Sequence, residues 1–91
     1  MIEDQDFQKL KSWIIETKRY NALSASDVLS RLKRLNRILS FSQFEHLGNW
    51  MYYLLEVEQQ EEFKKLSISV KSQMRKAWKI YVEYKNKPTT D

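Results

Sequence analysis

The sequence predicts an all-α fold, a small bundle of four main helices with room for a short fifth one. Three observations favour this class. The 91 residues include one glycine and one proline, no Asn-Gly or Asp-Gly turn occurs, and apolar residues recur at spacings of three and four. Hydrophobic residues make up 42% of the chain, which suffices for one modest core. We therefore expect a single helical domain over residues 1–87 and a disordered tail or linker start at 88–91.

The first helix is expected from about Asp4 to Lys18. Its start is acidic, with Asp4 and Asp6 placed where the helix dipole is positive. Four apolar side chains recur along one face and are expected to enter the core: Phe7, Leu10, Ile14 and Trp13. Residues 19–23 are expected to connect this helix to the next.

The second helix is expected to begin after Ser24. Ser24 is interpreted as its N-cap because Asp27 follows three residues later, as in a capping box. One helical face is apolar and should be buried, with Val28, Leu32, Leu35 and Leu39. The opposite face is polar and basic, with Ser30, Lys33, Arg34 and Arg37.

The last helix, Ile68–Lys85, is the longest amphipathic run and repeats the pattern of the second. A shift of 42 residues matches most apolar and basic positions, and both entrances read Leu-Ser-x-Ser. Ser67 is expected to cap this helix, and Pro88 follows its end. Its apolar face holds Val70, Met74, Ala77 and Tyr81. Its polar face holds Ser72, Arg75, Lys76 and Lys79.

The middle of the chain, residues 41–66, is acidic and less regular. Ser42 and Glu45 have capping-box spacing and predict a turn of helix, which Gly48-Asn49 then interrupts. The apolar run 50–57 predicts a short helix that is either buried by its neighbours or exposes a contact surface, and we expect burial. Residues 59–65 are expected to form a frayed helix end and a loop.

Positive charge is concentrated in the two matching helices. Residues 1–22 carry four basic and four acidic groups, 23–40 four and one, 41–66 two and five, and 67–91 six and two. One interpretation is that these charged side chains only form the water-exposed outer faces of the helices. The other is that they form a basic surface for an acidic partner.

The residue inventory argues against an enzyme, a cofactor and a metal site. The chain has no cysteine and no Gly-rich phosphate loop, and its single histidine, His46, has one adjacent carboxylate. The acidic residues of 56–62 are better explained as a solvated helix end than as a cation loop. Without a signal peptide or an apolar run of spanning length, we expect an intracellular, cytoplasmic protein and no membrane partner.

The two basic helices suit double-stranded DNA. A helix that begins with Leu-Ser-x-Ser offers hydroxyl and backbone N–H groups to a phosphate, and basic side chains one to three turns further can contact the same strand. The candidate contacts are Ser24, Ser26, Lys33, Arg34, Arg37, Ser67, Ser69, Arg75, Lys76 and Lys79.

Residues 7–85 resemble the N-terminal core-binding domain of tyrosine recombinases and phage integrases. The phrases LSASDVLSRLKRLNRIL and LSISVKSQMRKAWKIYVEY, preceded by DFQKLKSWIIETK, carry this resemblance. It implies a four-helix SAM-like domain with a role in DNA integration and recombination, whose second and fourth helices face the major groove. The family's catalytic domain has no counterpart here. The chain would be either a domain of a larger recombinase or a small independent protein.

The leading hypothesis is therefore a non-enzymatic DNA-binding domain that grips a duplex through two basic helices. Its partners would be double-stranded DNA and a recombinase catalytic domain in cis, or another protein. The alternative is a protein-interaction module that uses the aromatic run Trp50–Tyr53 and the acidic segment 56–62.

Overall fold

The computed structural model describes residues 4–41 and 51–86. Over these ranges the chain forms five helices and no strand, which confirms the predicted all-α bundle of four main helices and one short one. The helices are α1 (Asp4–Lys18), α2 (Ala22–Ile38), α3 (Met51–Val57), α4 (Glu61–Lys64) and α5 (Ile68–Lys85).

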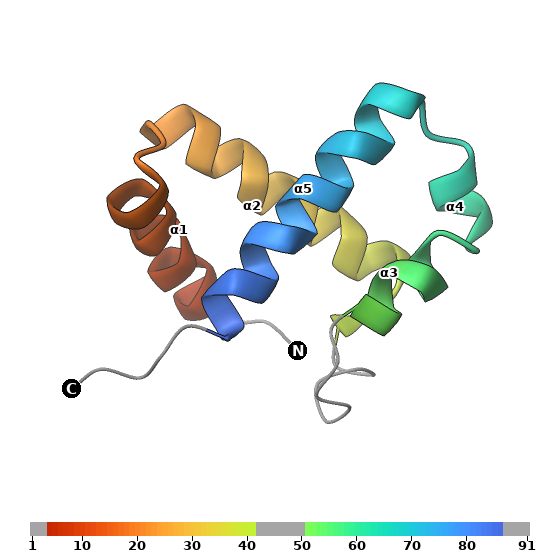
Figure 1. Ribbon diagram of the computed structural model, residues 1–91, viewed down its shortest axis with the longest axis horizontal. Helices are drawn as coiled ribbons and strands as arrows, with labels where there is room; N and C mark the ends of the chain where they lie inside the picture. Colours follow the sequence, from red (N-terminus) through yellow and green to blue (C-terminus); the bar gives the residue numbers. More distant parts are fainter. Residues whose placement is uncertain (1–3, 42–50, 87–91) are drawn as a thin grey trace.

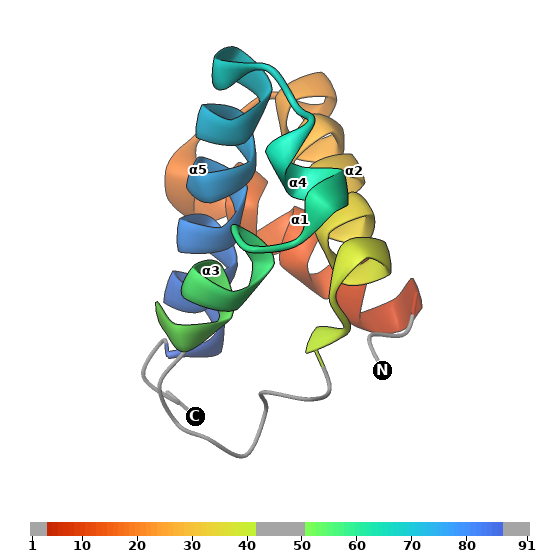
Figure 2. The same cartoon turned by 90° about the vertical axis from the view of Figure 1, so that its right-hand side faces the viewer.

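The three long helices α1, α2 and α5 form the body of the molecule. Helices α2 and α5 cross each other, with α5 in front of α2 in Figure 1, and α1 lies beside both. Figure 2 shows that α4 occupies the space between α2 and α5 on the side opposite α1, with α3 next to it. Helix α1 thus covers the α2–α5 pair on one side, and the short helices α3 and α4 cover it on the other.

The predicted apolar faces of α2 and α5 are buried. Val28, Leu32 and Leu35 are buried on α2, while Leu39, just after it, is partly buried. On α5, Met74, Ala77 and Tyr81 are buried and Val70 is partly buried. The predicted core residues of α1 also hold: Phe7, Leu10 and Ile14 are buried and Trp13 packs against them.

A cluster of aromatic side chains joins α3 to α5 and to the residues that follow α2. The Trp78 ring stacks on the Tyr53 ring with centroids 4.2 Å apart, and Phe41 meets both rings edge-on at 5.1 and 5.0 Å. The Tyr53 hydroxyl is 2.8 Å from the Leu35 carbonyl oxygen and 2.6 Å from that of Leu39, to which it donates at the end of α2. Burial raises the pKa of Tyr53 far above its usual value, so this hydroxyl keeps its proton.

The predicted start of α2 was wrong. The helix begins at Ala22, and its N-cap is Asn21, whose Oδ1 accepts a hydrogen bond from the Ser24 backbone N–H at 2.8 Å. The connection from α1 is only three residues long because Arg19 adopts a left-handed φ of 61°, which turns the chain sharply. At α5 the prediction is confirmed, because Ser67 Oγ accepts from the Val70 N–H at 3.2 Å.

The short helices correct two expectations about the middle of the chain. Only one face of α3 is buried, through Tyr53 and Val57, whereas Met51, Tyr52 and Leu55 are 60%, 55% and 60% exposed. Helix α4 forms inside the predicted loop because Phe63 enters the core. The predictions for Ser42, Glu45, His46, Gly48-Asn49, Trp50 and 87–91 lie outside the described residues.

Candidate nucleic-acid interface

The six basic side chains predicted to contact DNA are all exposed. They are Lys33, Arg34 and Arg37 on α2 and Arg75, Lys76 and Lys79 on α5. Arg34 and Arg37 line one hollow beside α4, however, whereas Arg75, Lys76 and Lys79 line a different groove beside α3. The predicted basic residues of the two helices therefore line separate hollows.

Several of these cations already have neighbours within the protein. Arg75 donates to Glu58 Oε1 from Nη2 at 2.6 Å and from Nε at 3.2 Å, and its guanidinium lies 5.9 Å from the Phe63 ring centroid. The Lys33 Nζ lies over the Phe7 ring, 5.3 Å from its centroid. These contacts direct both side chains along the protein surface.

Arg34 and Arg37 share a shallow hollow with the acidic residue Glu62 of α4. This hollow is about 240 Å³ in volume and is also lined by Ile38. Glu62 partly offsets the positive charge of the two arginines in this hollow. The predicted contacts on α2 thus face an acidic neighbour that the sequence pattern did not reveal.

Residues of α2 and α5 do meet at the flank of the crossing, in a groove of about 550 Å³ that we call the basic groove. Arg31 and Lys76 line it, and Arg19 stands at its end. Asp27 is the one carboxylate among its lining residues, which also include Tyr20, Asn21, Ser24, Val28, Gln73 and Ala77. The charged groups that line the groove therefore sum to a positive charge.

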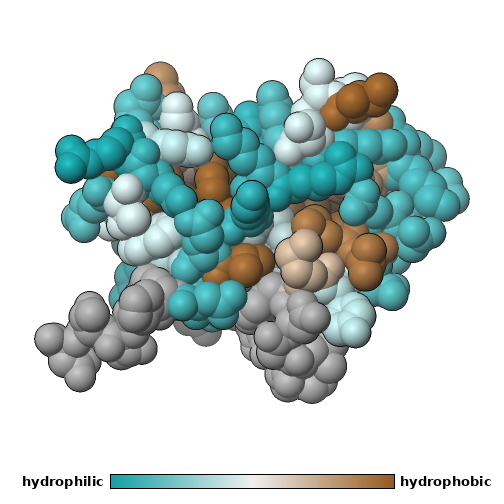
Figure 3. Space-filling view, in the orientation of Figure 1, coloured by the Kyte–Doolittle hydropathy of each residue, from teal (hydrophilic) through white to brown (hydrophobic). Residues whose placement is uncertain are grey.

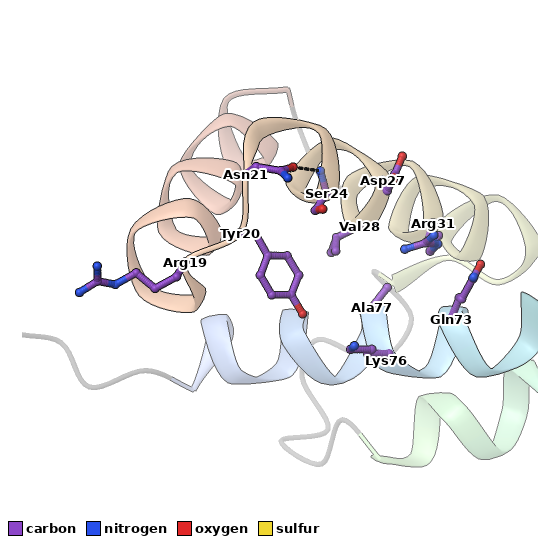
Figure 4. A pocket seen from close by; sticks show the side chains of 10 residues that line it. All are labelled: Arg19, Tyr20, Asn21, Ser24, Asp27, Val28, Arg31, Gln73, Lys76 and Ala77. Carbon is purple, nitrogen blue, oxygen red and sulfur yellow. Dashed lines mark hydrogen bonds between the residues drawn. The ribbon is translucent and has the colours of Figure 1, made fainter.

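Figure 4 shows how the chain builds this groove. Arg31 and Gln73 face each other from α2 and α5, Ser24 lies beside Asn21 near the start of α2, and Arg19 extends outwards beyond the corner. The sharp turn at Arg19 directs the Tyr20 ring into the gap between the α1–α2 corner and α5, where it is partly buried against the core. Tyr20 therefore lines the groove at this end.

Only two of the predicted contacts, Ser24 and Lys76, line the basic groove. Ser67 is engaged as the N-cap of α5, and the start of α5 lies far from the start of α2 in Figure 1. Ser26 does not line the groove. The matching Leu-Ser-x-Ser entrances are therefore not equivalent in space.

The prediction missed Arg19, Arg31 and Gln73. Arg31 follows Ser24 by seven residues with Asp27 between them, a spacing that places all three on one face of α2. That spacing is visible in the sequence, but Arg31 has no basic counterpart in the last helix, where a shift of 42 residues places Gln73. Arg19 carried no signal, because its left-handed conformation is set by the tertiary turn.

The basic groove offers guanidinium, ammonium, amide and hydroxyl donors, which suit a phosphate or another anion. Among residues 4–41 and 51–86, no group of three potential metal-ligating side chains gathers. Within the same ranges no helix has the length and apolar character needed to cross a bilayer.

No protein-family model matches this chain, and comparison with curated proteins and with solved structures likewise found no match. What is established is the fold class, a small all-helical domain.

Proposed function

We propose that this protein is a non-enzymatic domain that binds duplex DNA through the basic groove. The observation that carries the proposal is the convergence of Arg19, Arg31 and Lys76, from three different segments, around one groove with a single carboxylate. Phosphates are the dominant source of affinity in such complexes, and Arg binds them with two parallel hydrogen bonds. The groove lies open at the surface, so the sugar-phosphate backbone of one DNA strand can enter it from the side (Figure 4).

The resemblance to core-binding domains of tyrosine recombinases and phage integrases supports the same class of partner. It adds the proposals of a SAM-like topology, a role in DNA integration and recombination, and a catalytic domain in cis as a second partner. The proposed surface differs from the one that the resemblance implies, because the flank of the α2–α5 crossing replaces the outer faces. The other five predicted cations, which do not line the basic groove, add weaker, longer-range attraction.

Salt dependence gives the first test of this proposal. Each neutralised phosphate contributes about −0.9 to the slope of log affinity against log salt, so three groove cations predict a slope near about −3. The affinity for a fluorescent duplex should therefore fall about 40- to 60-fold between about 50 and 200 mM salt. An affinity that is independent of salt would contradict phosphate contact.

Charge reversal at the groove gives the second test. The double variant Arg31→Glu/Lys76→Glu should weaken duplex binding by more than about tenfold. The matched control Lys64→Glu/Lys65→Glu changes the net charge equally at two exposed positions in and beside α4, and should weaken binding by less than about threefold. Circular dichroism should show unchanged helix content in both. Equal losses in the two variants would mean that only net charge matters and would remove the groove from the proposal.

A protein-interaction module is the second candidate, and the exposed face of α3 favours it. Met51, Tyr52 and Leu55 place three large apolar side chains in water on one short helix. Tyr53 is fully buried and so contributes to the core rather than to a contact. If the wild type and the groove variant bind duplex equally, this candidate replaces DNA binding.

A further inference from the structure

A second groove, distinct in composition, runs between α3 and α5; we call it the apolar groove. Met51 and Leu54 line it from α3, and Trp78 and Val82 line it from α5, around a volume of about 420 Å³. Figure 3 shows hydrophobic side chains gathered on the surface over this part of the molecule. Leu55, 60% exposed and one turn after Met51, continues the apolar surface outwards from the groove. These side chains form a contiguous patch rather than isolated exposed residues.

The rim of the apolar groove is basic. Arg75, Lys76 and Lys79 lie within about one turn of each other on α5 and line the groove together with the apolar side chains. Arg75 is paired with Glu58, while Lys76 and Lys79 are exposed and form no ion pair among the residues that the structure describes. An apolar floor beside two available cations is complementary to a partner that combines apolar side chains with carboxylates.

The surrounding structure favours a helical partner over an extended one. The groove is formed by two helices, so it offers no strand edge to which an extended peptide could add. An amphipathic helix brings its own satisfied backbone and presents apolar side chains one turn apart, with acidic residues beside them. The concave shape also suits inserted side chains better than the flat surface of a bilayer.

We propose that the apolar groove docks a short acidic amphipathic helix from a partner protein. Apolar side chains of that helix would fill the space between Leu54 and Val82, and its carboxylates would contact Lys76 and Lys79. This proposal is independent of DNA binding except at Lys76, which lines both grooves.

The test is a selection from a random library of peptides about 16 residues long, displayed on their encoding RNA, against the immobilised full chain. Enriched peptides should carry apolar residues at spacings of three and four and a net negative charge. Binding of a selected peptide should shift backbone amide resonances of residues 51–55 and 75–82. No enrichment, enrichment of neutral or basic peptides, or shifts elsewhere would overturn the proposal.

Matched variants locate the site. Lys79→Glu on the rim and Met51→Ser on the wall should each weaken a selected peptide at least about tenfold. The controls Lys9→Glu on α1 and Leu23→Ser on α2 alter equally exposed side chains elsewhere and should change its affinity less than about twofold. Equal binding by all four variants would overturn the proposal even if peptides are enriched.

Two other occupants are distinguished in the same way. Binding to phosphatidylserine vesicles that Lys79→Glu abolishes, without peptide enrichment, would identify the groove as a membrane contact. A dimer in sedimentation experiments that Met51→Ser dissociates would identify a second copy of this chain. Met51→Ser should leave duplex affinity within about twofold of the wild type, so failure of the DNA proposal does not decide this one.

Discussion

The long helices α2 and α5 and the short helices α3 and α4 use their apolar residues in different ways. In α2 and α5, of 17 and 18 residues, a continuous apolar face is buried and the charged residues point outwards. In α3, of seven residues, two apolar side chains are buried and three stay exposed. Helix α4, of four residues, is attached through the single buried side chain Phe63.

Length explains this difference. A helix of five turns can place one residue per turn in the core, whereas a helix of one or two turns is unstable alone and depends on a few anchor residues. The anchors of the short helices are Tyr53, Val57 and Phe63. Apolar residues that are not anchors remain at the surface, where they are available for a partner. We therefore expect the long helices to determine most of the stability and α3 to supply exposed apolar side chains for a protein partner.

The largest loss of stability is expected at Trp78, the residue that joins the long helices to the short ones. Trp78→Ala removes a fully buried ring that stacks on Tyr53 and should cost about 3–5 kcal/mol of unfolding free energy. This is a large part of the stability of so small a domain. Urea unfolding followed by circular dichroism checks it, with Lys79→Ala, an exposed neighbour on α5, as the control. A loss below about 1 kcal/mol would mean that the aromatic cluster does not hold the two regions together.

The next effect concerns the Tyr53 hydroxyl, which ties α3 to the end of α2. Tyr53→Phe removes its hydrogen bonds and should cost about 1–2 kcal/mol. Because burial raises the pKa of Tyr53 in the folded state, the unfolded chain loses this proton first as pH rises above about 10. Tyr53 therefore contributes stability that is present below about pH 10 and falls at higher pH by about 1.4 kcal/mol per pH unit.

The measurement is urea unfolding of both proteins at several values between about pH 8 and 11. The difference in unfolding free energy between the wild type and Tyr53→Phe should become smaller above about pH 10, because only the wild type must keep Tyr53 protonated to fold. A difference that stays constant with pH would show that the hydroxyl is not buried as described.

A smaller effect, of opposite sign, is expected at the turn between α1 and α2. A left-handed conformation costs a residue with a Cβ atom about 1–2 kcal/mol, while glycine brings an entropic cost of about 0.5–1 kcal/mol. Arg19→Gly should therefore stabilise the fold by about 0.5–1 kcal/mol, as measured by urea unfolding, and weaken duplex binding by removing a cation from the basic groove. The control is Lys9→Gly, which should destabilise because it places glycine within a helix. Weaker folding in Arg19→Gly would contradict the strained turn.

The smallest effect should come from the exposed ion pair between the two regions. A double-mutant cycle of Glu58→Ala and Arg75→Ala should give a coupling energy of about 0.2–1 kcal/mol, since both side chains remain partly in water. The same cycle on Lys18 and Glu83, which join α1 to α5, provides the comparison within the long helices. A coupling above about 2 kcal/mol would mean that this pair, rather than the aromatic cluster, fixes α3 against α5.

Helices with local signals could be predicted from the sequence. The bounds of α1 and α5, the Ser67 cap and the buried faces of α2 and α5 follow from a period of 3.6 and from side chains that bond within one turn. The exposure of the six outer cations follows from the same period. These features were predictable because each depends on residues fewer than about five positions apart.

Tertiary structure alone decided the rest. Asn21 and Ser24 could each begin α2, and the turn at Arg19 selected Asn21. Phe63 became helical because a space between α2 and α5 accepts its ring, and Arg34, Arg37 and Arg75 acquired acidic neighbours because α3 and α4 fold against that space. The crossing of α2 and α5 brings Arg31 and Lys76 to one groove. A periodic pattern specifies which face of a helix is buried, but only the packing of helices against each other specifies which exposed residues become neighbours.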